Sequence, residues 1–128
     1  MKSRYALAVF CALLVVPAVA HHSGAAFDRN LPVTVSGTVA QVEWTSPHAR
    51  LHVAAKDDDG ASVTWDFELP SPVTLTRRGW SHTALKLGDA VTVTGIRARD
   101  FPYIAIATGV TDAGGRRLFS GSAAAAAE

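Results

Sequence analysis

The stretch that decides the fold is residues 31–69, which read LPVTVSGTVAQVEWTSPHARLHVAAKDDDGASVTWDFEL. It contains three runs of alternating apolar residues, separated by turn-forming segments at 44–48 and 57–60. Alternation with a period of two is typical of β-strands that bury one face and expose the other. The stretch therefore predicts three consecutive antiparallel strands.

The first of these runs changes phase in its middle. Its valines occupy odd positions as far as Val39 and an even position at Val42, with Gly37 inside the run. A phase change within one strand indicates a β-bulge, and an interior glycine allows a sharp bend. We expect a long, coiled first strand with a bulge near Ala40 and Gln41.

The second and third runs form a hairpin whose register follows from their apolar faces. Pairing Val53 with Trp65 keeps both apolar faces on one side and leaves a five-residue loop at 57–61. A slip of one residue would turn a whole apolar set outward. On the outer side, the same register sets His52 opposite Asp66 and Arg50 opposite Glu68, which predicts two cross-strand ion pairs.

A short helix and further strands follow the hairpin. Ser71 suits a helix N-cap, Pro72 the first helical position and Gly79 the left-handed C-terminal position. Alternating apolar residues then mark strands at 91–96, 103–111 and 116–119.

This order predicts an all-β fold, a five- to six-stranded OB-like Greek-key barrel with one short helix between the third and fourth strands. The main alternative, an immunoglobulin-like sandwich, needs about seven strands and no helix here. We expect the barrel to occupy residues 33–120, after an irregular arm at 21–32. The alanine-rich segment 121–128 is expected to be a disordered tail.

Residues 1–20 have the pattern of a secretory signal peptide. Lys2 and Arg4 precede an apolar run at 5–16, and small residues at 18–20 suit a signal peptidase. Cleavage after Ala20 predicts a periplasmic or secreted protein that begins at His21. The mature chain contains no second hydrophobic segment long enough to span a membrane.

Composition limits the class of partner. Removing Lys2 and Arg4 from the twelve basic residues leaves ten, against eleven acidic residues, so the mature chain has a net charge of −1. Such a balance gives no long-range attraction to phosphate backbones, and we expect no nucleic-acid partner. Cys11 is the only cysteine and lies within the signal peptide, so the mature domain must fold without disulfides.

Short motifs are found in order along the chain: His-His-Ser at 21–23, Phe-Asp at 27–28, Glu-Trp at 43–44, Pro-His at 47–48, Arg-Arg-Gly-Trp at 77–80 and Leu-Lys-Leu-Gly-Asp at 85–89. In this combination the sequence resembles an uncharacterised family of small exported bacterial proteins. The resemblance covers nearly all of the mature chain, from His21 to about Gly121. It implies an OB-like periplasmic domain, and it implies no catalytic or ligand residues because the family has no assigned function.

The predicted mature N-terminus is the sharpest chemical feature. His21 would offer both its α-amine and an imidazole nitrogen, and a second imidazole from His22, His48 or His52 would complete a nitrogen site. Cu(II) prefers tetragonal nitrogen ligation, so copper is the possible cofactor that these residues favour. The plain alternative is a polar start to the mature chain, with His48 in a turn and its ring bonded to a backbone carbonyl.

A possible ligand face lies on the outer side of the first three strands, which is the surface that OB barrels commonly use. It consists of Glu43, Arg50, His52, Asp66 and Glu68. Alternating charges on a solvated strand are the ordinary explanation of such a face. No nucleophile motif, glycine-rich phosphate loop or enclosed carboxylate pair is evident, and we expect no enzyme.

Three functions follow, in order of preference. The first is a small periplasmic binding protein, with copper as the ligand to test. The second is a ligand-free interaction module of the OB type that docks an unknown envelope protein. The third is an enzyme, which the residues support least.

Overall fold

The structure, a computed structural model, describes residues 27–121. The predicted signal peptide, His21, His22 and all but the first residue of the predicted tail lie outside the described residues. Within them, strands and a helix follow in the order β1 (Phe27–Glu43), β2 (Arg50–Lys56), β3 (Ser62–Glu68), α2 (Pro72–Arg77), β4 (Ala90–Ala98), β5 (Ile104–Asp112) and β6 (Arg117–Ser120). Among these residues, no helix has the length and hydrophobicity needed to cross a membrane.

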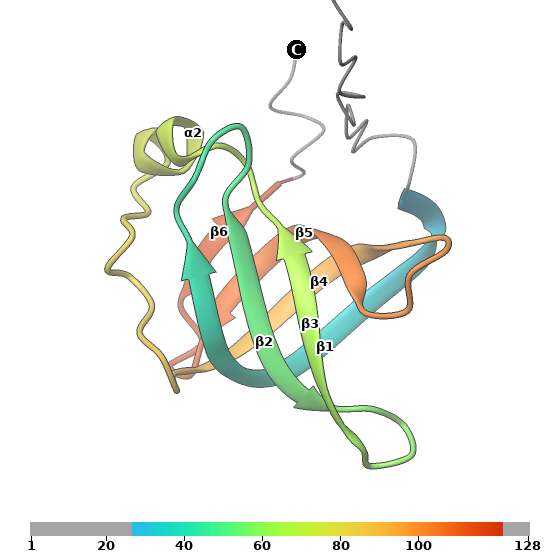
Figure 1. The fold of residues 1–128 in the computed structure, drawn as a ribbon. Coiled ribbons are helices and arrows are strands. Elements are labelled where there is room, and N and C mark those ends of the chain that lie inside the picture. Colours follow the sequence, from blue (N-terminus) through green and yellow to red (C-terminus); the bar gives the residue numbers. More distant parts are fainter. Residues whose placement is uncertain (1–26, 122–128) are drawn as a thin grey trace, which may run out of the picture.

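The strands close into a barrel. Their order in the sheet is β3-β2-β1-β4-β5-β6, and an additional pairing joins β3 to β5. That closing pair is parallel, at Asp66–Glu68 against Ile104–Ile106, whereas the other pairs are antiparallel. Figure 1 shows the strands wrapped around one another, with α2 at one end and the β2–β3 loop at the other. The predicted OB-like barrel, with one short helix between the third and fourth strands, is confirmed.

The long strand β1 takes part in both halves of the barrel. Its first part pairs with β4 as far as Thr38, and its last part pairs with β2 from Thr38 onward. The register shifts between Val39 and Gln41. The bulge predicted from the phase change of the valines is therefore present, and it lies just after the point where β1 changes partner.

The prediction of an irregular arm as far as residue 32 is wrong, because β1 already begins at Phe27. Phe27 lies opposite Ala98 and Pro32 opposite Ile96, with an irregularity between them. A local turn does form in this segment, because the Asn30 amide donates a hydrogen bond to Asp28 Oδ1 at 3.0 Å. The turn is absorbed as a distortion within the strand because β4 is long enough to pair on both sides of it.

The hairpin register is confirmed, with Val53 opposite Trp65 and Leu51 opposite Phe67. Leu51, Val53 and Phe67 are fully buried, and they form the centre of the core. Burying side chains of this size contributes roughly 1.5–3 kcal/mol each.

The three tryptophans contact this core to different depths. Trp80 is buried and packs edge-to-face on Trp44, with ring centroids 6.2 Å apart. Trp44 and Trp65 are half-buried and pack against the core from its margin.

The helix α2 has the predicted caps. The Ser71 hydroxyl accepts a hydrogen bond from the Thr74 amide at 3.2 Å, Pro72 begins the helix, and Gly79 has a φ of 85°. Leu75 is its buried residue. The helix lies at one end of the barrel, and the chain after it runs along the side of the barrel to reach β4.

Candidate functional site

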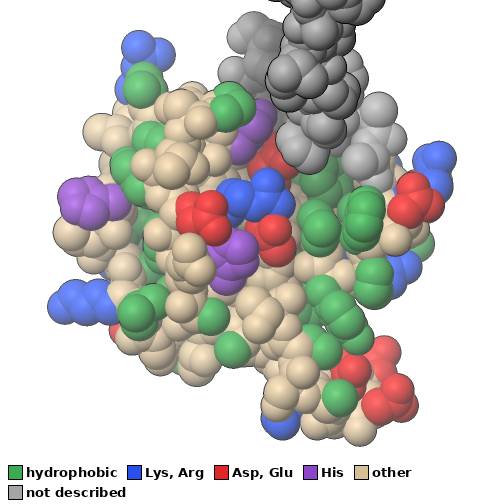
Figure 2. All heavy atoms as spheres, viewed as in Figure 1, with side chains coloured by type: hydrophobic (Ala, Val, Ile, Leu, Met, Phe, Trp, Pro, Cys, Tyr) green, Lys and Arg blue, Asp and Glu red, His purple; other side chains and the backbone are tan. Residues whose placement is uncertain are grey.

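A cluster of charged and imidazole side chains covers the outer side of β1, β2 and β3. Because Leu51 and Val53 point into the core, the alternate positions of β2 point outward. Figure 2 shows histidine, acidic and basic side chains gathered over this side of the molecule. We call this surface the polar face, and it consists of Glu43, His48, Arg50, His52, Asp66 and Glu68.

The centre of the polar face is a two-pronged ion pair. Arg50 donates from Nε to Asp66 Oδ1 at 2.8 Å and from Nη2 to Asp66 Oδ2 at 2.6 Å. The hydrogen bond to Asp66 raises the pKa of Arg50 above its usual value, against the opposing effect of burial. The guanidinium is thus a fixed positive charge between His52, which is on β2, and His48, which lies just before β2.

The predicted partners of these charges are wrong, although the backbone register is right. Arg50 lies opposite Glu68 and His52 opposite Asp66, yet Arg50 bonds to Asp66. A long side chain can reach the diagonal neighbour on the next strand. His52 instead turns to the other side, where Nε2 lies 2.7 Å from Glu43 Oε1.

A double-mutant cycle of Arg50→Ala and Asp66→Ala measures the coupling free energy of the ion pair between these two residues. The side chains are 32% and 24% exposed, so solvent screens the pair in part, and we expect a coupling free energy of about 1 kcal/mol in urea unfolding. The matched control is Arg99 with Asp28, whose atoms are 3.7 Å apart and whose arginine is 67% exposed. Its coupling should be close to zero, and equal coupling in both cycles would contradict this account.

His48 lies at the edge of the polar face, just before β2. The pairing of β2 continues past the strand, because Leu69 donates to the Ala49 carbonyl and Ala49 donates to the Pro70 carbonyl. This places the His48 ring so that Nδ1 lies 3.3 Å from the Leu69 carbonyl oxygen and 3.6 Å from Glu68 Oε1. The hydrogen bond to a backbone carbonyl, expected from the turn sequence, is confirmed.

Glu68 is the charged residue that this fold buries, with only 6% of its surface exposed. Its Oε1 has no hydrogen-bond partner among the described residues. Leaving a buried acceptor unpaired costs about 1–3 kcal/mol, and more for a charged group. This end of the polar face therefore combines a buried carboxyl group with an imidazole nitrogen 3.6 Å away.

The structure brings the predicted site residues together in pairs. Glu43 contacts His52, Arg50 contacts Asp66, and His48 approaches Glu68. Within residues 27–121, no group of three side chains is arranged to hold a metal ion. His21 and His22, the other predicted metal ligands, lie outside the described residues.

Comparisons with known proteins give one family and one solved structure. The mitochondrial single-stranded DNA binding protein Rim1 of S. cerevisiae has a similar fold, with a TM-score of 0.47 and 11% identity over 74% of this chain and 98% of that chain. No curated protein matches the sequence. A family of unknown function (DUF6152) matches residues 9–105, which is most of the chain. The protein therefore belongs to the DUF6152 family of unknown function.

Proposed function

We propose that this protein is a small exported binding protein of the bacterial envelope, and that its ligand is Cu(II). His21 at the processed N-terminus would supply its amine and one imidazole nitrogen, and His48 the second imidazole. The observation that carries the proposal is the setting of His48, whose Nδ1 faces an oxygen of the backbone and one of Glu68.

That setting is the one that metal-binding histidines usually have. Such a ring donates its second N–H to a carbonyl or carboxylate, which fixes its orientation and increases the basicity of the ligand nitrogen. When Nδ1 of His48 donates to the Leu69 carbonyl, Nε2 holds the lone pair, and it makes no hydrogen bond within residues 27–121. The side chain is 32% exposed, so a metal ion can reach it.

His52 is a weaker candidate than His48. Its Nε2 already contacts Glu43 at 2.7 Å, and its side chain is only 19% exposed. We therefore assign the second imidazole to His48.

Within residues 27–121 no group of three side chains is arranged to hold a metal ion, so the proposal takes its remaining ligands from His21. Residues 21–26 precede β1, and six extended residues span at most about 20 Å. The proposal therefore requires His48 to lie within about that distance of the start of β1, with the amine and imidazole of His21 completing the ligands.

Titration of Cu(II) into the protein processed to His21 tests the assignment of the second imidazole. His48→Ala should weaken binding at least about 10-fold, and Glu68→Gln should weaken it less, because Glu68 faces the ring at 3.6 Å without a hydrogen bond. His82→Ala is the control, because His82 is exposed and lies against Trp44, outside the polar face. Unchanged affinity in both test variants would exclude His48 as a ligand.

Mass spectrometry of the exported protein supplies the second test. We expect a mature chain that begins at His21. A different N-terminus would remove the amine ligand and leave the alternative function, an interaction module that docks an envelope protein through the polar face.

A further inference from the structure

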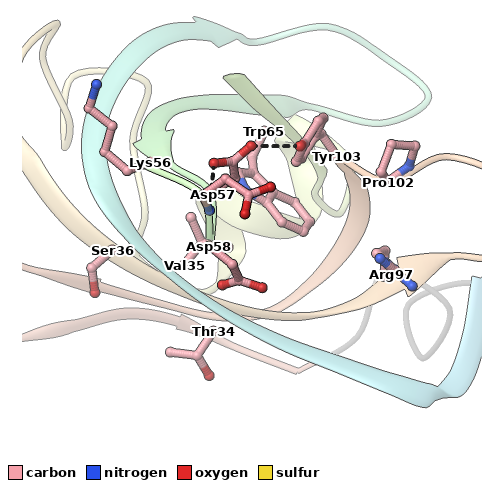
Figure 3. Close-up of a pocket in the computed structure, with 11 residues that line it drawn as sticks. Thr34, Val35, Ser36, Lys56, Asp57, Asp58, Trp65, Arg97, Pro102 and Tyr103 are labelled. Atoms are coloured by element: carbon pink, nitrogen blue, oxygen red, sulfur yellow. Dashed lines mark hydrogen bonds between the residues drawn. The ribbon is translucent and has the colours of Figure 1, made fainter. Parts of the chain in front are cut away.

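A pocket lies away from the polar face, and none of the polar-face side chains lines it. It has a volume of about 340 Å³, and its walls come from β1, the β2–β3 loop, β3, β4 and the β4–β5 loop. Figure 3 shows its labelled side chains, which include Trp65, Tyr103, Asp58 and Arg97. A volume of this size suits a small molecule.

Two aromatic rings form a corner of this pocket. Trp65 and Tyr103 meet almost at right angles, with an interplanar angle of 79° and centroids 5.5 Å apart. Behind Trp65, the ring of Phe67 stacks at 5.6 Å and anchors it to the core. The Tyr103 hydroxyl donates to Asp57 Oδ2 at 3.2 Å, and partial burial together with Asp57 raises the pKa of Tyr103. The corner is thus a fixed apolar surface with a protonated phenol at its edge.

The acidic loop beside this corner is also held in place. Asp57 Oδ1 accepts hydrogen bonds from the amides of Asp59 and Ala61, at 3.1 and 2.8 Å. Because Asp57 is occupied by these amides and by Tyr103, its carboxylate is structural. Asp58 is free of hydrogen bonds and ion pairs within residues 27–121, and Figure 3 shows it extending toward β1 in the pocket.

Arg97 on β4 lines the same pocket, and one of its hydrogen-bond donors has no acceptor among the described residues. Its Nε is buried and has no hydrogen-bond partner among the described residues. No carboxylate of residues 27–121 lies within ion-pair distance of it. A buried donor without a partner is rare in folded proteins and points to a missing acceptor. The other basic residue of the pocket, Lys56, is engaged with the Ser62 hydroxyl at 2.6 Å.

We propose that this pocket binds a small zwitterion of the amino-acid or short-peptide class. The ligand carboxylate accepts from Arg97, its ammonium group faces Asp58, and its side chain packs on Trp65 and Tyr103. In Figure 3, Trp65 lies between Asp58 and Arg97, and all three side chains line the same pocket. A ligand of one charge sign would leave either Arg97 or the carboxylates of Asp58 and Asp59 unpaired, which favours a dipolar ligand.

The test compares three forms of one probe, the dipeptide Ala-Phe: the free dipeptide, its C-terminal amide and its N-acetyl derivative. Binding is followed by calorimetry and by tryptophan fluorescence, to which Trp44, Trp65 and Trp80 all contribute. The free dipeptide should bind at least about 10-fold more tightly than either modified form, because each modification removes one charge-assisted contact.

Two variants assign the ends of the ligand. In Arg97→Gln, the free dipeptide and its amide should bind alike, while the N-acetyl form remains weaker. In Asp58→Asn, the free and N-acetyl forms should bind alike, while the amide remains weaker. Arg99→Gln is the control, since Arg99 is 67% exposed and does not line the pocket, and it should leave all three affinities unchanged. Thermal unfolding of each variant verifies that the fold is intact.

Equal binding of the three forms by the unmodified protein would overturn the proposal. So would the absence of saturable binding up to about 10 mM, a concentration that would detect even a weak ligand. Neither result depends on copper, so this site and the proposed metal site succeed or fail separately.

Discussion

Gly37→Ala should lower the free energy of unfolding by about 3 kcal/mol. A Cβ at this position would lie 2.2 Å from the Ala54 carbonyl oxygen and 2.9 Å from Cγ1 of Val53. The nearest of these atoms belongs to the backbone of β2, which cannot move aside as a flexible side chain would. β1 must therefore separate from β2 or the ladder between them must distort.

The reason for a glycine at this position is the path of β1. Gly37 lies one residue before Thr38, which pairs with both β4 and β2. Two strands cross at close range where β1 changes partner, and only a residue without a side chain fits between them. Gly95 on β4 makes a similarly close approach, since a Cβ there would lie 2.6 Å from the Ile106 carbonyl oxygen.

Gly114→Ala is the matched control for Gly37→Ala. Gly114 lies in the β5–β6 turn, and an added Cβ would meet only the Asp112 side chain at 3.4 Å. Urea unfolding should show a change below about 0.5 kcal/mol for this variant. Equal stability of the Gly37→Ala variant and the unmodified protein would mean that β1 does not cross β2 as closely as the structure shows.

The second large effect concerns the N-terminus. Acetylating the α-amine of His21 should weaken Cu(II) binding by about 100-fold or more, which corresponds to about 2.7 kcal/mol. Acetylation converts the amine into an amide and removes the anchoring ligand, while both imidazoles remain. A competition titration with a chelator of known copper affinity measures the difference.

His21→Ala in the processed protein separates the two nitrogens of this residue. It retains an α-amine but loses the imidazole, and we expect a loss similar to that caused by acetylation. Equal copper affinity in the acetylated, His21→Ala and unmodified proteins would exclude the N-terminus from the site. A loss in His48→Ala alone would instead place the metal entirely on the barrel.

Much of the fold could be predicted because alternation constrains a strand strongly. The phase change between Val39 and Val42 located the bulge, and the shared apolar face of the hairpin set Val53 opposite Trp65. Ser71 and Gly79 located the ends of α2 because each meets a local backbone requirement. These features depend on residues near one another in the sequence.

Features that depend on tertiary partners could not be predicted in the same way. β1 begins as early as Phe27 because β4 extends to Ala98 and pairs with it there. The turn-forming residues at 28–30 gave no sign of a strand in the sequence. The partners of Arg50 and His52 depend on diagonal reach and on the placement of Glu43 beside β2. Parity alone gives only the directly opposite residue.

The candidate sites differ in how far the sequence could indicate them. Outward parity identified Glu68 as a surface residue of the polar face, whereas the structure buries it beside His48 at the end of the strand. The pocket of Trp65, Tyr103 and Arg97 was not predicted. It brings together a loop, a hairpin and β4, and no spacing in the sequence relates these segments.

Elemental analysis of the protein purified from its own compartment, without an N-terminal tag, tests the central claim most directly. If Cu(II) is the ligand of His21 and His48, the protein should carry close to one copper per chain, and the His48→Ala variant purified in parallel should carry far less. A chain that begins at His21 and holds no copper, or that holds the same amount with and without His48, would contradict the account.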